Sequence, residues 1–176
     1  IPGRHNAYNA LAAAATGRIL DVPWGDIQRV LAGFKSVHMR AEIIRKDGVV
    51  VINDCYNANP DSMAAALELL AEVEGMRKIA VLGDMLELGP QSSRLHAAAG
   101  ERAAQNADMV LTVGSEAKHL VDAARSAGMD KDLARHFEDA DQIGEFAAAH
   151  LGCGDVVLVK ASRGMALDSV VKRIMR

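Results

Sequence analysis

Short apolar runs that alternate with amphipathic segments are the feature that most constrains the fold of this chain. The strand-like runs lie at 49–53, 78–82, 109–113, 135–137 and 156–160. The segments with helical periodicity lie at 61–74, 91–106, 115–127, 140–151 and 165–175. Strands that are apolar throughout are typical of a parallel sheet that helices cover on both faces. Because crossovers between parallel strands are right-handed, the pattern predicts a doubly wound α/β sheet.

The beginning of the chain has a different pattern. An Ala-rich stretch at 6–18 favours a helix, and Pro23 suits the first turn of a second one. Strand-like runs at 39–46 and 49–53 then flank Asp47-Gly48, a strong signal for a hairpin turn. We therefore expect a short helical segment over residues 1–35. A Rossmann-like, mostly parallel sheet with helices on both faces is expected over residues 36–176, with the hairpin at its start.

The composition excludes several classes of protein. The 176-residue chain has a formal net charge of −3 with acids and bases interleaved, so we expect no nucleic-acid partner. It has no apolar run near the ~20 residues that a membrane-spanning helix needs, so no membrane insertion is expected. Two cysteines are too few for a disulfide scaffold and suit a reducing cytosol. We expect a cytoplasmic, monomeric protein.

The loops that leave the carboxyl ends of the strands are the candidate site, because ligands of such sheets bind there. In the first loop, Asn59 and Pro60 suit the N-cap and first turn of the next helix, which is a structural explanation. Asp54, Tyr56 and Asn57 directly follow an apolar strand and have no such explanation. A carboxylate at Asp54 is placed to accept hydrogen bonds from a ribose diol, so we interpret this loop as functional.

Two further loops carry charged or polar residues. Asp84 lies between Gly83 and Gly89, where either a simple turn or a tight loop near a ligand fits the spacing. In the last loop Ser162 can cap the following helix. Arg163, beside the predicted N-terminus of that helix, would make an electropositive spot suited to a carboxylate or phosphate.

Several motifs of self-sufficient enzymes are missing from the sequence. It contains no GxxxxGK[ST] phosphate loop, no GxGxxG after a strand and no GxSxG nucleophile elbow. Its six histidines have no HExxH or other metal-binding spacing, so we expect no metal site in this chain. The sequence therefore contains no motif of a self-sufficient catalytic centre.

Segments spread over nearly the whole chain resemble one known family. They are GRHNAYNA at 3–10, DCYNANPDSM at 54–63, AVLGDMLELG at 80–89 followed by His96, and KASRGM at 160–165. Together they resemble the Mur ligases, most closely the member that joins D-alanyl-D-alanine to UDP-N-acetylmuramoyl-tripeptide. The resemblance implies that residues 1–35 are the last helices of a central ATPase domain. Residues 36–176 would then be the Rossmann-like C-terminal domain.

The resemblance also implies a reaction and its cofactors. ATP and Mg2+ would convert the carboxylate of the tripeptide into an acyl phosphate, which the amine of D-Ala-D-Ala attacks. The phosphate loop and metal ligands belong to the family's central domain, so Mg2+ would be bound mainly there. We therefore expect this chain to show no ligase activity by itself.

Individual residues acquire roles from the same resemblance. Asn6, next to His5, is similar to the asparagine that reads the adenine of ATP, and Arg40 to the arginine at the interdomain nucleotide site. Asp54 is similar to the aspartate that binds the ribose. The residues expected to bind the incoming dipeptide are Asn57, Asp84, Ser162 and Arg163. Cys55, where Ser or Ala is common, is expected to make the site sensitive to thiol reagents.

Two other interpretations stay open from the sequence. The chain could belong to another Mur-like amide ligase such as a folylpolyglutamate synthase, although the YNANP segment at 56–60 argues against it. It could also be a non-catalytic module that binds a nucleotide or a peptide.

Overall fold

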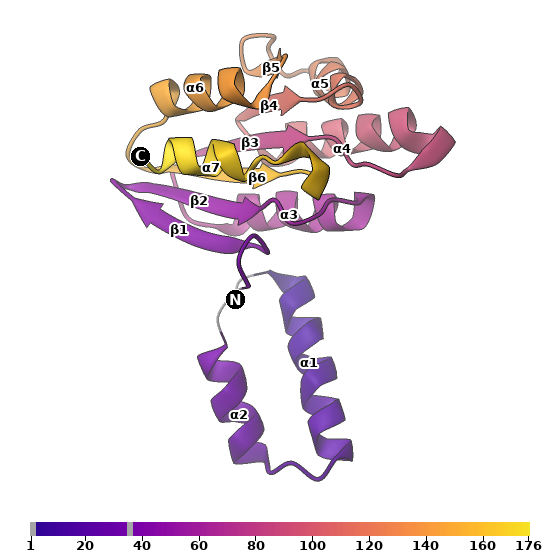
Figure 1. Ribbon diagram of the computed structural model, residues 1–176, viewed down its shortest axis with the longest axis vertical. Helices are drawn as coiled ribbons and strands as arrows, with labels where there is room; N and C mark the ends of the chain where they lie inside the picture. Colours follow the sequence, from indigo (N-terminus) through magenta and orange to yellow (C-terminus); the bar gives the residue numbers. More distant parts are fainter. Residues whose placement is uncertain (1–2, 35–36) are drawn as a thin grey trace.

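A computed structural model describes residues 3–34 and 37–176, without the side chains of residues 4 and 5. Within that part, a six-stranded sheet is covered by helices on both faces (Figure 1). The strands are β1 (Glu42–Lys46), β2 (Val49–Asp54), β3 (Arg77–Gly83), β4 (Met109–Val113), β5 (Ala134–Phe137) and β6 (Asp155–Lys160). The helices are α1 (Arg4–Ile19), α2 (Trp24–Gly33), α3 (Pro60–Glu72), α4 (Ser92–Asn106), α5 (Ala117–Ser126), α6 (Ala140–His150) and α7 (Asp168–Ile174), with short 3-10 turns η1 (Gly89–Gln91) and η2 (Arg163–Met165).

The strand order confirms the predicted doubly wound sheet. It runs β1-β2-β6-β3-β4-β5, with β1 antiparallel to β2 and the other neighbours parallel. This order places β6, the last strand, between β2 and β3. The carboxyl ends of β2 and β6, which are far apart in sequence, therefore lie side by side, with Asp54 opposite Lys160.

Two apolar clusters, one on each face, explain why the central strands are apolar throughout. In β6, Val157 and Val159 belong to the cluster that includes residues of α6 and α7. Val156 and Leu158 belong to the other cluster, with residues of α3, α4 and α5. Because successive side chains of a strand point to opposite faces, every position of such a strand is buried.

The hairpin at the start of the sheet follows the prediction at its turn but not at its first strand. Asp47 and Gly48 have φ angles of 51° and 81°, which confirms a turn with two positive φ angles. The predicted first run, 39–46, is too long, because β1 begins only at Glu42. Met39 and Ala41 adopt φ angles of 62° and 48°, a left-handed conformation that cannot continue a strand.

The end of the chain also differs from the prediction. One helix was expected over 165–175, but the 3-10 turn η2 comes first and α7 starts only at Asp168. Ala166 separates the two with a φ of 50°. Arg163 therefore lies in the 3-10 turn and not at the N-terminus of the α-helix, contrary to the prediction.

The helical segment stands apart from the layered body (Figure 1). Helices α1 and α2 expose large apolar side chains, among them Tyr8, Leu11, Ile19 and Trp24. The predicted boundary between residues 35 and 36 falls on positions outside the described ranges, so it stays a prediction. Neither of these helices, nor any other in the described ranges, is long and apolar enough to cross a membrane.

Candidate functional site

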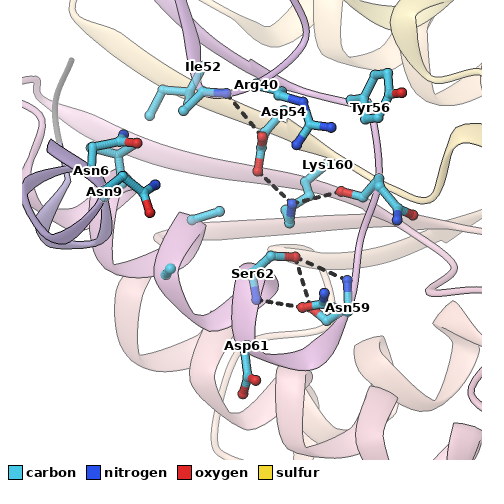
Figure 2. Close-up of a pocket in the computed structure, with 15 residues that line it drawn as sticks. Asn6, Asn9, Arg40, Ile52, Asp54, Tyr56, Asn59, Asp61, Ser62 and Lys160 are labelled. Carbon is cyan, nitrogen blue, oxygen red and sulfur yellow. Dashed lines mark hydrogen bonds and ion pairs between the residues drawn. The ribbon is translucent and has the colours of Figure 1, made fainter. Parts of the chain in front are cut away.

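A polar cleft of about 460 Å³ opens where β2 and β6 end, between the start of α1 and the start of α3 (Figure 2). Three of the residues predicted to bind ATP, Asn6, Arg40 and Asp54, line this cleft together. The fourth, His5, belongs to α1, but its side chain is outside the described part. The structure thus brings together residues from three segments that are distant in sequence.

Asp54 is held by both of its carboxylate oxygens. Its Oδ1 accepts a hydrogen bond from the amide of Ala41 at 3.0 Å, and its Oδ2 accepts one from Nζ of Lys160 at 2.5 Å. The side chain is 18% exposed, so it is fixed but still reaches the cleft. Since a carboxylate oxygen can accept two hydrogen bonds, both oxygens keep capacity for hydroxyl donors of a ligand.

Lys160 is a site residue to which sequence reasoning gave no role. Its side chain is 1% exposed, and its Nζ also donates to the carbonyl oxygen of Asn57 at 3.0 Å. The sequence did carry a signal for it. A lysine that ends a strand buried on both faces must find a partner, because an unpaired buried charge is costly.

Arg40 is presented by an unusual turn. It lies between the left-handed residues Met39 and Ala41, and the amide of Tyr56 donates to the carbonyl of Met39 at 3.1 Å. The Arg40 guanidinium carbon lies 4.1 Å from the centroid of the Tyr56 ring, a cation–π contact. The turn and the ring together hold a permanent cation at the cleft, which suits an anionic ligand.

The start of α3 forms the floor of the same cleft. Asn59 caps this helix, accepting from the amide of Ser62 at 2.8 Å, while the Ser62 hydroxyl accepts from the amide of Asn59 at 3.0 Å. This capping box confirms the structural explanation given to Asn59 from the sequence.

A second cleft of about 350 Å³ adjoins the first, because Tyr56 and Asn57 line both. Three of the four residues predicted to bind the dipeptide, Asn57, Ser162 and Arg163, line it. Glu87, which the sequence reasoning did not single out, adds a carboxylate. The second cleft therefore contains side chains of both charges.

Ser162 connects the loops that flank the second cleft. Its Oγ accepts from the amide of Leu86 at 2.9 Å and lies 3.3 Å from the carbonyl oxygen of Ala58, to which it donates. It makes no capping bond to the turn that follows it, so the alternative of a helix cap is wrong. Its position in the cleft wall is compatible with ligand contact, but its hydroxyl already has two protein partners.

Asp84 is 4% exposed, and its carbonyl oxygen accepts from the amide of Ser162, a residue of the second cleft, at 3.0 Å. Its Oδ1 accepts from the amides of Glu116 and Ala117 at 3.1 and 2.7 Å, which are at the beginning of α5. The carboxylate therefore satisfies free amides at a helix N-terminus, where a negative charge is favourable. It is not among the residues that line either described cleft, and its contact with a substrate stays a prediction.

His96 positions the loop between β3 and α4. The ring is buried; its Nε2 accepts from the amide of Met85 at 2.9 Å, and its Nδ1 lies 2.9 Å from the carbonyl oxygen of Ser92. Since a carbonyl can only accept, Nδ1 carries the proton and the neutral ring bridges α4 and the loop. The role of His96 in this structure is to hold that loop.

The environment of Cys55 contradicts the expected sensitivity to thiol reagents. The residue is 2% exposed, and its Sγ donates to the carbonyl oxygen of Val159 at 3.3 Å. Burial, and then the charge of Asp54, raise the pKa of the Cys55 thiol to about 12. Because the thiolate is the nucleophile that reacts with thiol reagents, burial and the raised pKa both disfavour reaction of Cys55 in the folded protein.

A polar cleft at the carboxyl ends of a doubly wound sheet defines a ligand-binding α/β domain. Among the residues that the structure describes, no three His, Cys, Asp or Glu side chains are grouped as a metal site would require. The cleft can supply a carboxylate, a guanidinium and side-chain amides, the groups that bind a sugar, a phosphate and a base.

Comparison with known proteins then identifies the family. The chain belongs to the Mur ligases, because residues 39–163 match the family described as "Mur ligase, glutamate ligase domain". It is 37% identical to UDP-N-acetylmuramoyl-tripeptide–D-alanyl-D-alanine ligase of Bacillus subtilis, over 99% of this chain and 39% of that protein. The corresponding ligase of Escherichia coli is also 37% identical, over 99% of this chain and 38% of that protein.

A solved structure gives the same result for the fold. The MurF ligase of Thermotoga maritima, in complex with ADP, matches 99% of this chain with a TM-score of 0.85 and 30% identity. The match covers 38% of that protein. The chain therefore spans less than two fifths of the length of each of these three relatives.

Proposed function

We propose that this chain is the C-terminal part of an ATP-dependent ligase of peptidoglycan precursor synthesis, which joins D-alanyl-D-alanine to UDP-N-acetylmuramoyl-tripeptide. The observation that carries the proposal is the cleft where Asn6, Arg40 and Asp54 meet, in a chain 37% identical to the Bacillus subtilis ligase. The protein would act in the cytoplasm as a monomer.

The first cleft would bind the nucleoside part of ATP. Asp54 has free acceptor capacity for the two ribose hydroxyls, and Asn6 has the paired donor and acceptor that a base edge requires. His5 would act beside Asn6. Arg40, stacked on Tyr56, would bind a phosphate oxygen through a charge-assisted hydrogen bond. That the Thermotoga maritima relative was solved with ADP supports this assignment.

The second cleft would bind D-alanyl-D-alanine. Arg163 suits the carboxylate of the dipeptide, and the Asn57 amide can bind its peptide group. Glu87 supplies the negative charge on the same wall. Ser162 and Asp84 would act on the dipeptide through the loops that they hold, rather than through a free polar group.

The proposed reaction uses the closeness of the two clefts. ATP would phosphorylate the tripeptide carboxylate, the dipeptide amine would attack the acyl phosphate, and phosphate would leave the tetrahedral intermediate. Bringing the amine beside the nucleotide site contributes the proximity term of catalysis. Mg2+ would neutralise the phosphates, and it would be bound mainly by parts of the ligase that this chain does not contain.

Replacement of Asp54 tests the proposal in the full-length ligase. Asp54→Ala should weaken ATP binding by about 1.5–3 kcal/mol, the usual value for a hydrogen bond to a charged group. Asp139→Ala is the matched control, because Asp139 caps α6 and does not line the cleft. Isothermal titration with a non-hydrolysable ATP analogue measures both. Equal affinity in the Asp54 variant and the parent would refute the nucleotide assignment.

The choice of acceptor separates this function from that of a folylpolyglutamate synthase. The ligase should consume ATP with UDP-N-acetylmuramoyl-tripeptide and D-Ala-D-Ala, and not with a folate and glutamate. Phosphate release measured with each substrate pair gives the answer, and turnover with the second pair would overturn the proposed substrate.

A further inference from the structure

Lys160 is among the residues that line the first cleft, although its side chain is only 1% exposed (Figure 2). We propose that Lys160 is a positioning residue, which holds the Asp54 carboxylate in the orientation that receives the nucleotide. The inference rests on the proposed nucleotide site. It adds to that site a residue from β6, which is the last strand in the sequence and lies between β2 and β3 in the sheet.

The sheet itself brings the two residues together. Asp54 ends β2 and Lys160 ends β6, and they are direct partners in the parallel register. Partners in a parallel pair project their side chains to the same face, so the ammonium and the carboxylate meet at 2.5 Å. With the amide of Ala41 on the other oxygen, the carboxylate plane is fixed from two sides.

Lys160 is too confined to act on the substrate itself. Its side chain is 1% exposed, and its ammonium donates both to Asp54 and to the carbonyl oxygen of Asn57. Movement towards a bound phosphate would break both bonds and leave the partly buried Asp54 carboxylate without its counter-charge, which is unfavourable. The exposed member of the pair, Asp54, is the one that can meet a ligand.

Stability alone is a weak explanation for this pair. The cost of removing two charges from water largely offsets their attraction, so a buried ion pair contributes little net stability. What the pair does supply is orientation, since both oxygens of Asp54 have defined donors while the side chain remains open to the cleft. Lys160 also donates to the Asn57 carbonyl oxygen, so one ammonium group links Asp54 to the loop that follows β2.

Titration of full-length ligase with a non-hydrolysable ATP analogue tests the inference. Lys160→Met keeps a long, unbranched side chain and removes the charge. It should lower ATP affinity by about ten- to a hundredfold. The matched control is Lys46→Met, because the Lys46 ammonium donates to the carbonyls of Met175 and Arg176 and does not line the cleft. It should bind the analogue as the parent does.

A double variant separates positioning from direct contact. If Lys160 acts only through Asp54, then Asp54→Asn and Asp54→Asn/Lys160→Met should bind the analogue equally. A further tenfold loss in the double variant would mean that Lys160 touches the nucleotide, and would overturn the inference. Should Lys160→Met alone fail to fold, this comparison still decides. In Asp54→Asn the new amide oxygen and the Asn57 carbonyl oxygen can accept from the Lys160 ammonium, and the double variant contains no unpaired charge at this position.

The outcomes also separate this inference from the proposed function. Weakened binding in Asp54→Asn together with intact binding in Lys160→Met would overturn the role of Lys160 and leave the nucleotide site standing. Intact binding in Asp54→Asn would overturn the nucleotide site, and the positioning role with it.

Discussion

Two consecutive side chains at the end of β2 lie in different environments, one at the polar cleft and one in the apolar core. Asp54 faces the cleft, whereas Cys55, the next residue, points into the apolar cluster beneath the sheet. This alternation is the ordinary consequence of extended backbone. A one-residue step therefore separates a group that can bind ligand from one that is chemically inert.

The buried thiol predicts a pH dependence of stability. The thiol of Cys55 has an ordinary pKa of 9.0 and a folded pKa of about 12, so between these values the unfolded state loses its proton first. The folded state then binds more protons, and the free energy of unfolding falls as pH rises through this range. The Cys55 thiol contributes at most about 1.4 kcal/mol per pH unit to this decrease in the free energy of unfolding.

Urea unfolding at a series of pH values from below 9.0 upward measures this slope. Cys55→Ala should show a shallower decrease than the parent, while Cys153→Ala should match the parent because Cys153 is exposed. Parallel curves for the parent and Cys55→Ala would contradict the assignment of the slope to this thiol.

At the scale of elements, the packing of α4 against α5 depends on a glycine. A Cβ added to Gly100 would overlap the backbone carbonyl of Leu120 and touch Cβ of Ala123. A backbone carbonyl within a helix cannot move aside independently. The glycine thus allows the two helices to approach more closely than any other residue would.

Gly100→Ala should consequently destabilise the domain, although alanine favours helix by about 1 kcal/mol. Overpacking costs of about 1–3 kcal/mol are typical, and here the overlap is with backbone, so we expect a net loss. Gly25→Ala, within α2, is the control, because among the described residues the added Cβ has nothing within 4 Å beyond its chain neighbours and its own helix backbone. Chemical denaturation should show a loss only for Gly100→Ala; greater stability of that variant would show that the helices separate freely.

The helices α1 and α2 should be the least protected elements of this chain. Tyr8, Leu11, Ile19 and Trp24 are each more than half exposed, whereas β3 and β6 are almost wholly buried. Few apolar contacts mean a small free energy of local opening. We expect amide exchange in α1 and α2 to be faster than in β3 and β6. Equal protection would mean that the two helices are not a separate segment, and that the predicted boundary is misplaced.

The positions of three central strands could be predicted from the sequence. The run from 109 to 113 matches β4, and the runs from 78 to 82 and 156 to 160 lie within β3 and β6, because strands buried on both faces leave a continuous apolar signal. The two errors, at 39–41 and at 165–167, arise where non-glycine residues are left-handed. Nothing in the local composition marks Met39, Ala41 or Ala166 as left-handed, since only tertiary contacts stabilise that conformation there.

For the whole molecule, the proposed division of labour predicts an inactive chain. Phosphoryl transfer depends mainly on groups that fix and neutralise the γ-phosphate, and the sequence has no GxxxxGK[ST] loop for that task. The 176-residue chain, given ATP, Mg2+ and both substrates, should release no phosphate above background. The full-length ligase under the same conditions is the positive control, and turnover by the chain alone would overturn this division.

What the sequence by itself determined is the class of fold and the edge of the sheet where the two clefts lie. Apolar runs, helical periodicity and the Asp47-Gly48 turn are local signals, and polar residues at strand ends mark the ligand-binding edge. The motifs also led to the family, which the match over residues 39–163 bears out. Each of these signals depends on residues that are close together in the sequence, so the sequence alone is enough to detect it.

Only the tertiary structure decided which polar groups meet. Lys160 pairs with Asp54 across 106 positions of sequence. The Asp84 carboxylate accepts a hydrogen bond from the amide of Ala117, at the start of α5. Local periodicity predicts that a side chain is buried but not which partner it finds, because the partner depends on strand order and on how closely helices pack. The strand order, for example, places β6 beside β2. This neighbourhood brings Lys160 next to Asp54 in the proposed nucleotide site.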